Sequence, residues 1–179
     1  GASMDRVATL AEACASRAEP LVVAICNAPT DVVISGHPAA LDRFVGRAPH
    51  CAAVRRLRVG GAFHSPLMEP LSAEWTSRVQ ATRFGTPTIA FAANATGSLV
   101  NSPDEIGRAV AAQLTSPVRW HQCLDALSDF GVGHGIECGD SRTLRRIGHL
   151  AEYPTVAARD PRALLTAVRA VETRPEVDR

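Results

Sequence analysis

The 179-residue sequence contains no lysine, because all 19 of its basic side chains are arginine. This absence excludes Schiff-base chemistry with an aldehyde cofactor and a phosphate loop that ends in Gly-Lys-Ser. Aromatic residues make up only 4%, and the net charge of +1 leaves no basic surface of the kind that nucleic acids bind. No apolar run approaches the roughly 20 residues of a membrane span. We therefore expect neither nucleic acid nor membrane as a partner.

The five cysteines form no Cys-x-x-Cys pair and are odd in number. This usage favours reduced thiols in the cytoplasm over a disulfide framework or a zinc site, so we expect a cytoplasmic location and no metal. The composition, with 46% apolar and 21% charged residues, is that of an ordinary globular protein.

The first 60 residues alternate between helical and strand patterns. Apolar spacing predicts a helix from Asp5 to about Arg17, and two short apolar runs predict strands at Leu21–Cys26 and Asp31–Ser35. A helix follows Pro38, and a third strand is predicted at Ala52–Val59, with Arg55, Arg56 and Arg58 on a solvated edge. The order helix, strand, strand, helix, strand is that of a ferredoxin-like subdomain whose first strand is missing, which leaves an open sheet edge.

The remainder of the sequence reads as longer αβ units. Helices are predicted at Pro66–Val79, Pro103–Leu114, Trp120–Phe130, Thr143–Leu150 and Pro161–Val171, with strands at Thr88–Ala92 and Gly135–Cys138. Residues 94–102 are expected to form a loop containing a turn at Asn94, and residues 151–160 a connector. This alternation predicts an α/β fold with a parallel sheet.

His64 is the most informative candidate for chemistry. It lies between the pair Gly60-Gly61 and Pro66, a setting that can present an imidazole to a cleft, and the ordinary pKa of histidine suits a general base. A single histidine can equally be a packed or surface residue. The other five histidines show no metal-ligand spacing with one another, so from the residues alone the role of His64 stays open.

Four ordered motifs resemble one family. They are NAPTDVVISG (27–36), AFHSPLM (62–68), NATG (94–97) and QLTSPVRW (113–120). Together they closely resemble the second half of malonyl-CoA:acyl carrier protein transacylases, above all the acyltransferase domains of modular polyketide synthases. The match covers about residues 5–150, and the segment after it looks like the linker that follows such domains.

This resemblance implies an α/β fold in which a ferredoxin-like small subdomain is joined to the C-terminal part of an α/β-hydrolase-like acyltransferase subdomain. The corresponding boundaries are residues 4–60 for the small subdomain, 61–152 for the part of the large one, and 153–179 for a linker and C-terminal helix. It implies no cofactor. Malonyl-CoA is the expected substrate, and the phosphopantetheine of an acyl carrier protein is the expected acceptor.

The resemblance also assigns residues. His64 matches the base that activates a serine, and Gln113 matches the residue whose main-chain carbonyl orients that base. Phe63 matches the position that tracks the extender unit and favours malonyl over methylmalonyl, although Gly61 departs from the family's His-Ala-Phe-His pattern. Asn27 matches a cleft-lining asparagine, and it fits equally well as an ordinary turn residue after a strand.

Other family elements do not occur in these 179 residues. The sequence has no Gly-x-Ser-x-Gly elbow, no Gly-Gln-Gly oxyanion loop and no arginine in a helix after such an elbow, and the family's Glu-Val-Gly-Pro-Gly turn has drifted to ECGDS at 137–141. Ser65 looks like an invariant neighbour of the base, not like a nucleophile. We therefore expect no transacylation by this sequence alone.

Two interpretations follow. The sequence is the histidine-bearing half of an acyltransferase, completed by a complementary N-terminal half, with a neighbouring ketosynthase domain as a further possible partner. Alternatively, it is a non-catalytic relic that serves as a structural or docking element of a polyketide synthase. A thiol enzyme that pairs a cysteine with His64 is the weaker third option, because the cysteines fall within predicted helices and strands.

Overall fold

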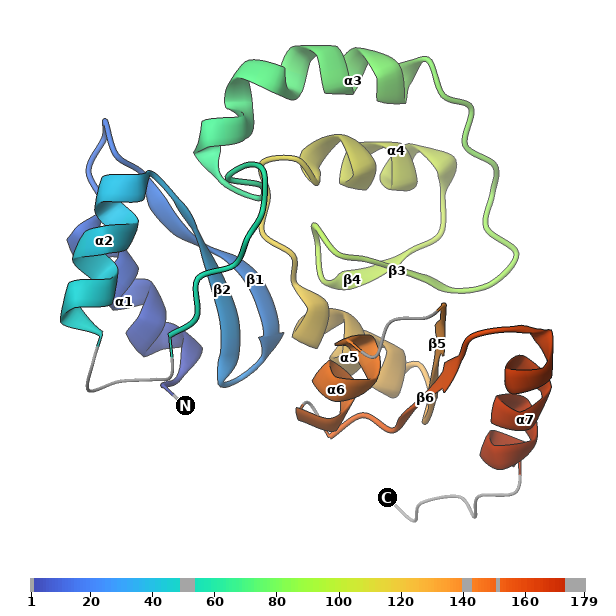
Figure 1. Ribbon diagram of the computed structural model, residues 1–179. Coiled ribbons are helices and arrows are strands. Elements are labelled where there is room, and N and C mark those ends of the chain that lie inside the picture. Colours follow the sequence, from blue (N-terminus) through green and yellow to red (C-terminus); the bar gives the residue numbers. More distant parts are fainter. Residues whose placement is uncertain (1, 49–53, 140–142, 151, 173–179) are drawn as a thin grey trace. The chain divides into compact units, whose positions relative to one another are not determined.

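The computed structural model describes residues 2–48, 54–139, 143–150 and 152–172 (Figure 1). Cys51 and the positions Asp140 and Ser141 of the drifted turn lie outside these described residues, as does the tail 173–179. The chain forms two compact units, residues 1–126 and 127–179. Within the described residues, every helix is too short or too polar to span a bilayer.

The first unit begins with a hairpin and two helices. Helix α1 (Met4–Cys14) precedes strands β1 (Leu21–Ala28) and β2 (Asp31–Gly36), which pair antiparallel, and helix α2 (Pro38–Arg47) follows. His37 caps α2, because its Nδ1 accepts the Ala39 N–H at 3.3 Å. The sequence predicted all four elements in this order.

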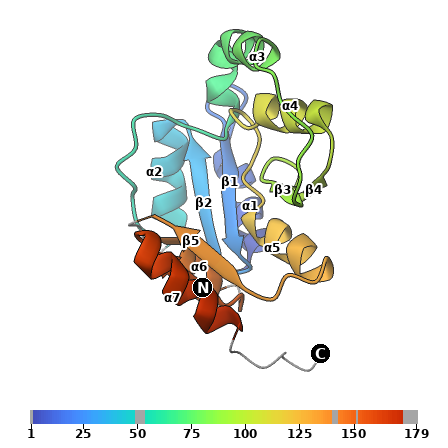
Figure 2. The ribbon, with the colours of Figure 1, turned by 90° about the vertical axis from the view of Figure 1, so that its right-hand side faces the viewer.

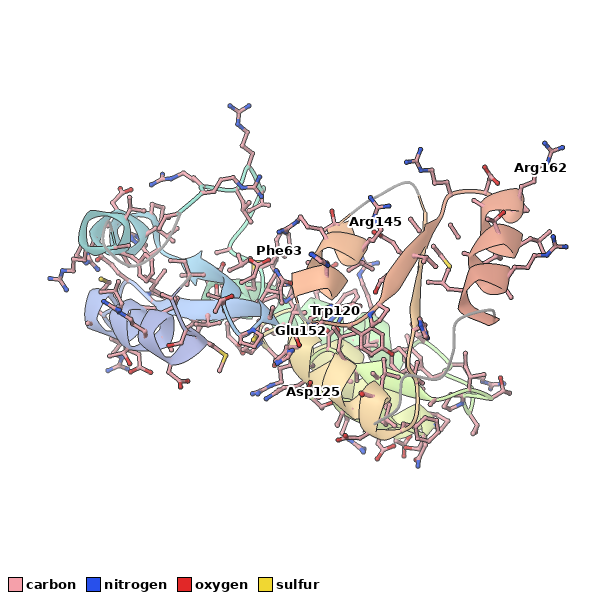
Figure 3. The ribbon with its side chains drawn as sticks, turned by 90° about the horizontal axis from the view of Figure 1, so that it is seen from below. Phe63, Trp120, Asp125, Arg145, Glu152 and Arg162 are labelled. Atoms are coloured by element: carbon pink, nitrogen blue, oxygen red, sulfur yellow. The ribbon has the colours of Figure 1, made fainter. Side chains whose placement is uncertain are left out.

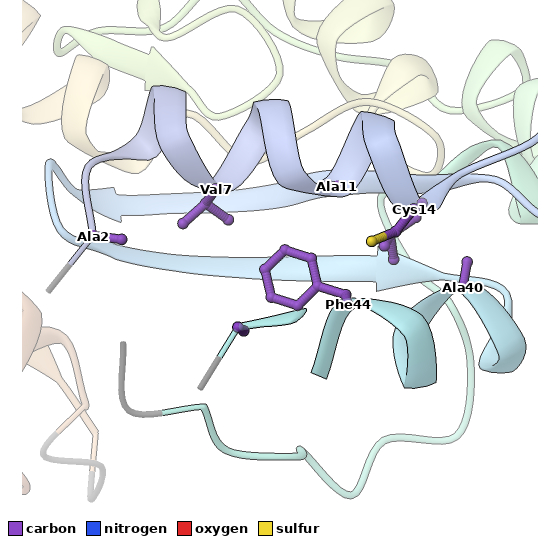
Figure 4. Close-up of a cluster of buried hydrophobic side chains, with 8 residues drawn as sticks. Ala2, Val7, Ala11, Cys14, Ala40 and Phe44 are labelled. Carbon is purple, nitrogen blue, oxygen red and sulfur yellow. The ribbon is translucent and has the colours of Figure 1, made fainter. Parts of the chain in front are cut away.

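One apolar cluster holds these four elements together (Figure 4). Val7, Ala11 and Cys14 recur at helical spacing and form the buried face of α1, while Phe44 contributes the largest buried side chain of α2. The Arg43 guanidinium adds a polar tie, since it donates to the Cys14 carbonyl at 2.7 and 3.0 Å. The apolar residues that the sequence spaces at helical intervals are therefore the ones that the fold buries in this part of the chain.

The rest of the first unit is built on two helices and a short hairpin. The 3-10 helix η1 (Pro66–Leu71) runs into α3 (Ser72–Gln80), which packs against α4 (Pro103–Ala112). Between them, β3 (Phe91–Ala93) and β4 (Ser98–Val100) pair antiparallel, and α5 (Trp120–Asp129) begins in the first unit and ends in the second.

Helix α4 begins at a capping box. Ser102 Oγ accepts the Glu105 N–H at 3.3 Å, and the Glu105 carboxylate accepts the Ser102 N–H at 3.1 Å. Hydrogen bonds from the Asn101 main chain, and then from the Ser102 hydroxyl, lower the pKa of Glu105. The cap is therefore made by an ionised carboxylate.

The second unit is a βαβα arrangement. Strands β5 (Gly135–Cys138) and β6 (Thr155–Ala158) pair parallel, with α6 (Thr143–Leu150) between them and α7 (Pro161–Glu172) after them. The buried Glu137 carboxylate accepts the Leu144 and Arg145 N–H groups at the start of α6. Figure 3 shows Arg162, at the start of α7, pointing away from this unit.

Three sequence predictions need correction. The predicted strand at 52–59 is wrong over its described part, because Val54–Val59 belongs to no helix or strand, although Arg56 pairs with Asp42 at 2.6 Å. The predicted loop at 94–102 contains β4, and the predicted connector at 151–160 contains β6. Short strands of this kind depend on distant partners, which local patterns do not reveal.

The predicted parallel sheet is found only in part. Among the described strands, β5 and β6 pair parallel, whereas the pairs β1–β2 and β3–β4 are antiparallel. The turn predicted at Asn94 is confirmed as the connection of the β3–β4 hairpin. Gly97 in this turn has φ +69°, and an added Cβ would lie 2.7 Å from Gln122, so the position requires glycine.

Candidate functional site

His64 occupies a tight turn between Gly61 and η1. Its φ of +60° is unusual for a residue with a side chain, and such a conformation costs about 1–2 kcal/mol. The imidazole is half-buried. A strained residue of this kind persists only where its surroundings fix it, and two contacts with the end of α4 do so.

The main chain that follows α4 holds both the backbone and the ring of His64. The His64 N–H donates to the Leu114 carbonyl at 3.1 Å, and Nδ1 lies 2.8 Å from the Gln113 carbonyl oxygen. Both carbonyls lie just beyond the last residue of α4, at the C-cap Gln113 and at Leu114, where the helical hydrogen-bond pattern no longer takes up the main-chain acceptors. His64 is thereby attached to a point 49 residues away in the sequence.

The Gln113 contact selects the tautomer of His64. A carbonyl oxygen can only accept, so the 2.8 Å contact places the proton on Nδ1 and leaves Nε2 as the acceptor. The Gln113 side-chain Nε2 lies farther from Nδ1, at 3.4 Å, and as a second donor it could not bond a protonated nitrogen. The ring is therefore arranged to take up a proton at Nε2.

Ser65 stabilises the turn around His64 through its side-chain hydrogen bonds. Its side chain is fully buried, its hydroxyl donates to the Ala62 carbonyl at 2.6 Å, and it accepts the Leu67 N–H at 3.3 Å as the N-cap of η1. Because the side chain is fully buried and its proton is donated to a main-chain carbonyl, the hydroxyl is not presented to a substrate. A serine directly before a proline-initiated helix is a local capping signal, and it could have predicted this role.

Phe63 and Asn27 lie in different surroundings. Phe63 is 47% exposed, and its ring lies against Gly61, since a Cβ placed on that glycine would be in van der Waals contact with the ring at 3.4 Å. Asn27 is half-buried at an irregularity of β1 between Cys26 and Ala28. Among the described contacts, no hydrogen bond joins Asn27 to His64.

The segment 113–120 connects these parts. Val118 forms a parallel bridge with β1, donating to the Ala24 carbonyl at 2.8 Å and accepting the Cys26 N–H at 2.9 Å. Arg119 donates its N–H to the Asn94 carbonyl at 2.8 Å. Main-chain bonds therefore join this segment to the motifs at 62–68 and 94–97 and to the part of β1 that directly precedes the motif at 27–36, a convergence that the sequence did not predict.

Trp75 is a further residue that the sequence analysis did not single out. Its indole N–H donates to the Val110 carbonyl at 2.9 Å, one of the last carbonyls of α4. This bond fixes α3 against the end of the helix that orients His64. No local signal identifies it, because its partner lies 35 residues away.

The cysteines of the described chain do not form a nucleophilic site. Burial raises the pKa of the Cys26 and Cys123 thiols, which disfavours their reactive thiolate form. Cys14 is buried in the core cluster, and Cys138 is exposed in the second unit. Over the described residues, no three His, Cys, Asp or Glu side chains gather as metal ligands would.

Comparison with known proteins identifies the family. The model of the acyl transferase domain matches residues 2–146. Over 179 aligned residues the chain is 34% identical to polyketide synthase GfsB of Streptomyces halstedii, covering 98% of this chain and 3% of the synthase. It is 37% identical over 109 residues to the malonyl CoA-acyl carrier protein transacylase of Mycolicibacterium smegmatis, covering 61% of this chain and 38% of that protein.

A solved structure agrees with this match. The acyl-carrier-protein S-malonyltransferase of Burkholderia pseudomallei superposes with a TM-score of 0.86 at 26% identity, over 94% of this chain and 56% of that one. The chain thus spans about half the length of that protein, and less of the Mycolicibacterium smegmatis transacylase.

Proposed function

The chain belongs to the acyl transferase domain family, and from this premise we propose that it is the histidine-bearing half of a malonyl-CoA to acyl carrier protein transacylase of the polyketide synthase type. The observation that carries the proposal is the 2.8 Å contact between Nδ1 of His64 and the Gln113 carbonyl, which leaves Nε2 free to accept a proton. The match to a polyketide synthase over 98% of the chain supports the synthase type.

His64 acts as the general base in this proposal. Its Nε2 removes the proton of a serine hydroxyl supplied from outside these 179 residues, and the serine oxygen attacks the thioester carbonyl of malonyl-CoA. The C–S bond then breaks, the CoA sulfur takes the proton from the imidazolium, and the malonyl group remains as a serine ester. The reverse sequence, with the phosphopantetheine thiol of an acyl carrier protein, releases the group to that partner.

The nucleophile is the part that this sequence does not contain. It has no Gly-x-Ser-x-Gly elbow, and Ser65 is bonded as both donor and acceptor. We therefore propose that the chain alone does not transfer malonyl groups and that a complementary N-terminal half supplies the serine and the oxyanion donors. A neighbouring ketosynthase domain is a further proposed contact.

Phe63 is the proposed selectivity residue. A phenyl ring before the base would crowd the α-methyl group of methylmalonyl, so malonyl-CoA is the proposed substrate. Gly61 stands where the family's pattern has histidine, and a Cβ at this position would make an ordinary contact with the Phe63 ring. Asn27 is the proposed lining residue from the small subdomain.

The proposed organisation follows the family. Residues 4–60 form a ferredoxin-like small subdomain, residues 61–152 the C-terminal part of the large subdomain, and residues 153–179 a linker and helix. We propose a cytoplasmic protein of polyketide biosynthesis that needs no cofactor of its own.

Mass spectrometry tests the function. The chain is incubated with malonyl-CoA alone, and then with the part of the Mycolicibacterium smegmatis transacylase that the match leaves uncovered, expressed as a separate polypeptide. The malonyl mass increment should appear only in the mixture and only on the added polypeptide. His64→Ala should abolish it, whereas His134→Ala, a substitution in the second unit, should not. Labelling of this chain alone would refute the proposal.

A second candidate is a non-catalytic relic within a polyketide synthase, supported by the drifted turn after Glu137. In a producing strain, the relic predicts that His64→Ala leaves the product unchanged while deletion of the domain abolishes it. Loss of product with His64→Ala would instead support the transacylase proposal over the relic.

A further inference from the structure

The C-terminal end of α4 takes its hydrogen-bond donors from another part of the chain. Its C-cap residue Gln113 has φ −58° and ψ −29°, so it is not the left-handed residue that ends many helices, and its last turn, Ala-Val-Ala-Ala, holds no basic side chain. Such an end needs donors from elsewhere. His64 supplies two, to the Gln113 and Leu114 carbonyls. Trp75 of α3 supplies a third, from its indole N–H to the Val110 carbonyl at 2.9 Å.

The sequence withholds the two carbonyls that hold His64 from any longer helix. In a continued α-helix, the Gln113 carbonyl would accept from Pro117, which has no N–H. The Leu114 carbonyl would accept from Val118, whose N–H is already bonded to β1 at 2.8 Å. Both acceptors are therefore available to His64, and what remains to be set is their direction.

The Val110 carbonyl sets that direction, because the α-helical pattern stops there. It accepts the Gln113 N–H at 3.3 Å in a 3-10 bond, whereas an α-helix would use the Leu114 N–H. Among the described main-chain bonds, the Leu114 N–H makes none to this carbonyl. A carbonyl oxygen has two lone pairs, so the Trp75 indole and the Gln113 N–H together fill it. The last turn therefore stays tight, in the form that turns the next two carbonyls toward His64.

The indole is tied to the same segment of chain as the imidazole. η1 follows the turn at His64 and runs directly into α3, which lies beside α4 in two views of the ribbon (Figures 1 and 2). Val79, one helical turn after Trp75 on the same face of α3, is buried, while Trp75 itself is 37% exposed. A phenylalanine could cover similar apolar surface, so the feature that only tryptophan adds here is the N–H donor.

We propose that Trp75 is a positioning residue for the general base. By filling the Val110 carbonyl, its indole keeps the last turn of α4 tight, and this turn aims the Gln113 carbonyl at Nδ1 of His64. The proton stays on Nδ1, and Nε2 is held ready to take up the serine proton. The inference rests on the proposed function, since it assigns Trp75 to the base of that reaction. Trp75 acts through main-chain groups and not on the substrate.

Three substitutions separate positioning from simple packing of α3 on α4. Trp75→Phe removes the N–H and keeps an aromatic ring. Trp75→Gln restores a donor, because its amide nitrogen lies as many bonds from Cβ as the indole nitrogen does. Trp120→Phe is the matched control, since it makes the same exchange of indole for phenyl at a side chain whose Nε1 has no hydrogen-bond partner among the described residues.

The ring of His64 is measured in the chain alone. Long-range proton–nitrogen spectra at about pH 8.5, where imidazoles are neutral, give the ratio of Nδ1-protonated to Nε2-protonated His64. Trp75→Phe should lower this ratio at least about fivefold, the equivalent of one ordinary hydrogen bond. The His64 amide should exchange faster by a similar factor, because its bond to the Leu114 carbonyl depends on the same turn. Trp75→Gln and Trp120→Phe should change either quantity by less than about twofold.

Two results overturn the positioning role. One is a tautomer ratio and a His64 amide exchange that Trp75→Phe leaves unaltered, even where the free energy of unfolding falls, because the indole then only fastens α3 to α4. The other is an equally low ratio in Trp75→Gln or in Trp120→Phe, which would assign the effect to lost aromatic bulk and not to the N–H.

Malonyl labelling separates this inference from the proposed function. In the mixture with the uncovered part of the Mycolicibacterium smegmatis transacylase, Trp75→Phe should lower kcat by about fivefold and leave KM for malonyl-CoA unchanged. Labelling of the parent mixture with no change of the ring in Trp75→Phe overturns the positioning role and leaves the function standing. A changed ring without labelling of the parent mixture supports the hold of Trp75 on His64 and refutes the function.

Discussion

Replacing Ser65 by alanine removes a buried hydroxyl that makes two part-buried hydrogen bonds in the turn around His64. Loss of the cap of η1 costs about 1 kcal/mol. The Ala62 carbonyl also loses its 2.6 Å donor, and an unsatisfied buried acceptor costs about 1–2 kcal/mol more. We therefore expect Ser65→Ala to lower the free energy of unfolding by about 2–3 kcal/mol.

Urea unfolding followed by tryptophan fluorescence measures this change. Trp75 and Trp120, the two tryptophans of the sequence, both lie in the first unit, so the signal reports the unit that contains Ser65. At a slope of about 2 kcal/mol per molar urea, the midpoint should fall by about 1 M. Ser98→Ala is the matched control, because its hydroxyl bonds only the Thr96 hydroxyl at an exposed site, and it should cost less than about 0.5 kcal/mol.

The ring of His64 gives a second measurement. Long-range proton–nitrogen spectra at about pH 8.5, where imidazoles are neutral, should show the proton of His64 on Nδ1 in the parent chain. In Ser65→Ala the released turn should lower the share of this tautomer. A midpoint shift no larger than that of Ser98→Ala would refute the stability argument. An unchanged tautomer would show that Ser65 supports folding without positioning the His64 ring.

Three further predictions concern other parts of the chain. Gly97→Ala should destabilise the first unit by about 2–3 kcal/mol, because φ is +69° and the new Cβ meets Gln122 at 2.7 Å. Gly46→Ala, in the last turn of α2 with open space around the new Cβ, should instead stabilise by up to about 0.5 kcal/mol, and equal effects of the two substitutions in urea unfolding would contradict this reasoning. The pKa of Glu105 is lower in the folded state than in the unfolded one. The stability that the cap provides is therefore present above the ordinary glutamate pKa, near 4.3, and is lost as the pH falls through the lowered pKa. Glu105→Gln should remove this acid dependence of the unfolding free energy, and a pH profile identical to that of the parent chain would exclude the cap as its source. In the complemented mixture, Phe63→Ala should raise methylmalonyl labelling relative to malonyl by at least about tenfold, as expected for about 1.4 kcal/mol of relieved crowding, and an unchanged ratio would remove Phe63 from selectivity.

The helices and their caps could be predicted from local sequence. Helix α4 follows from Ser102, Pro103 and Glu105 within one turn, and α1 from apolar residues three and four apart. The turn around His64 follows from its glycine pair and from Pro66. Such features depend on groups a few residues apart, so each is specified by a short stretch of sequence.

The short strands could not be predicted in this way. β4 has three residues and depends on the turn at Gly97, and β6 depends on a parallel pairing with β5 about 20 residues earlier. The segment 54–59 shows the converse, since its apolar residues suggested a strand that does not form. A strand satisfies its main-chain groups through other strands, and local pattern does not say whether those are present.

The sequence by itself therefore determined the helices, the turn that presents His64 and, through four ordered motifs, the family. Only the tertiary structure decided how His64 is held. Its Nδ1 contacts the carbonyl of Gln113, which is 49 residues away in the sequence. The neighbouring Ser65 hydroxyl both donates and accepts a hydrogen bond, and Val118 joins the segment 113–120 to β1. The reason is physical: a helix forms its hydrogen bonds within itself, whereas the imidazole of His64 is oriented by a carbonyl that only folding brings beside it.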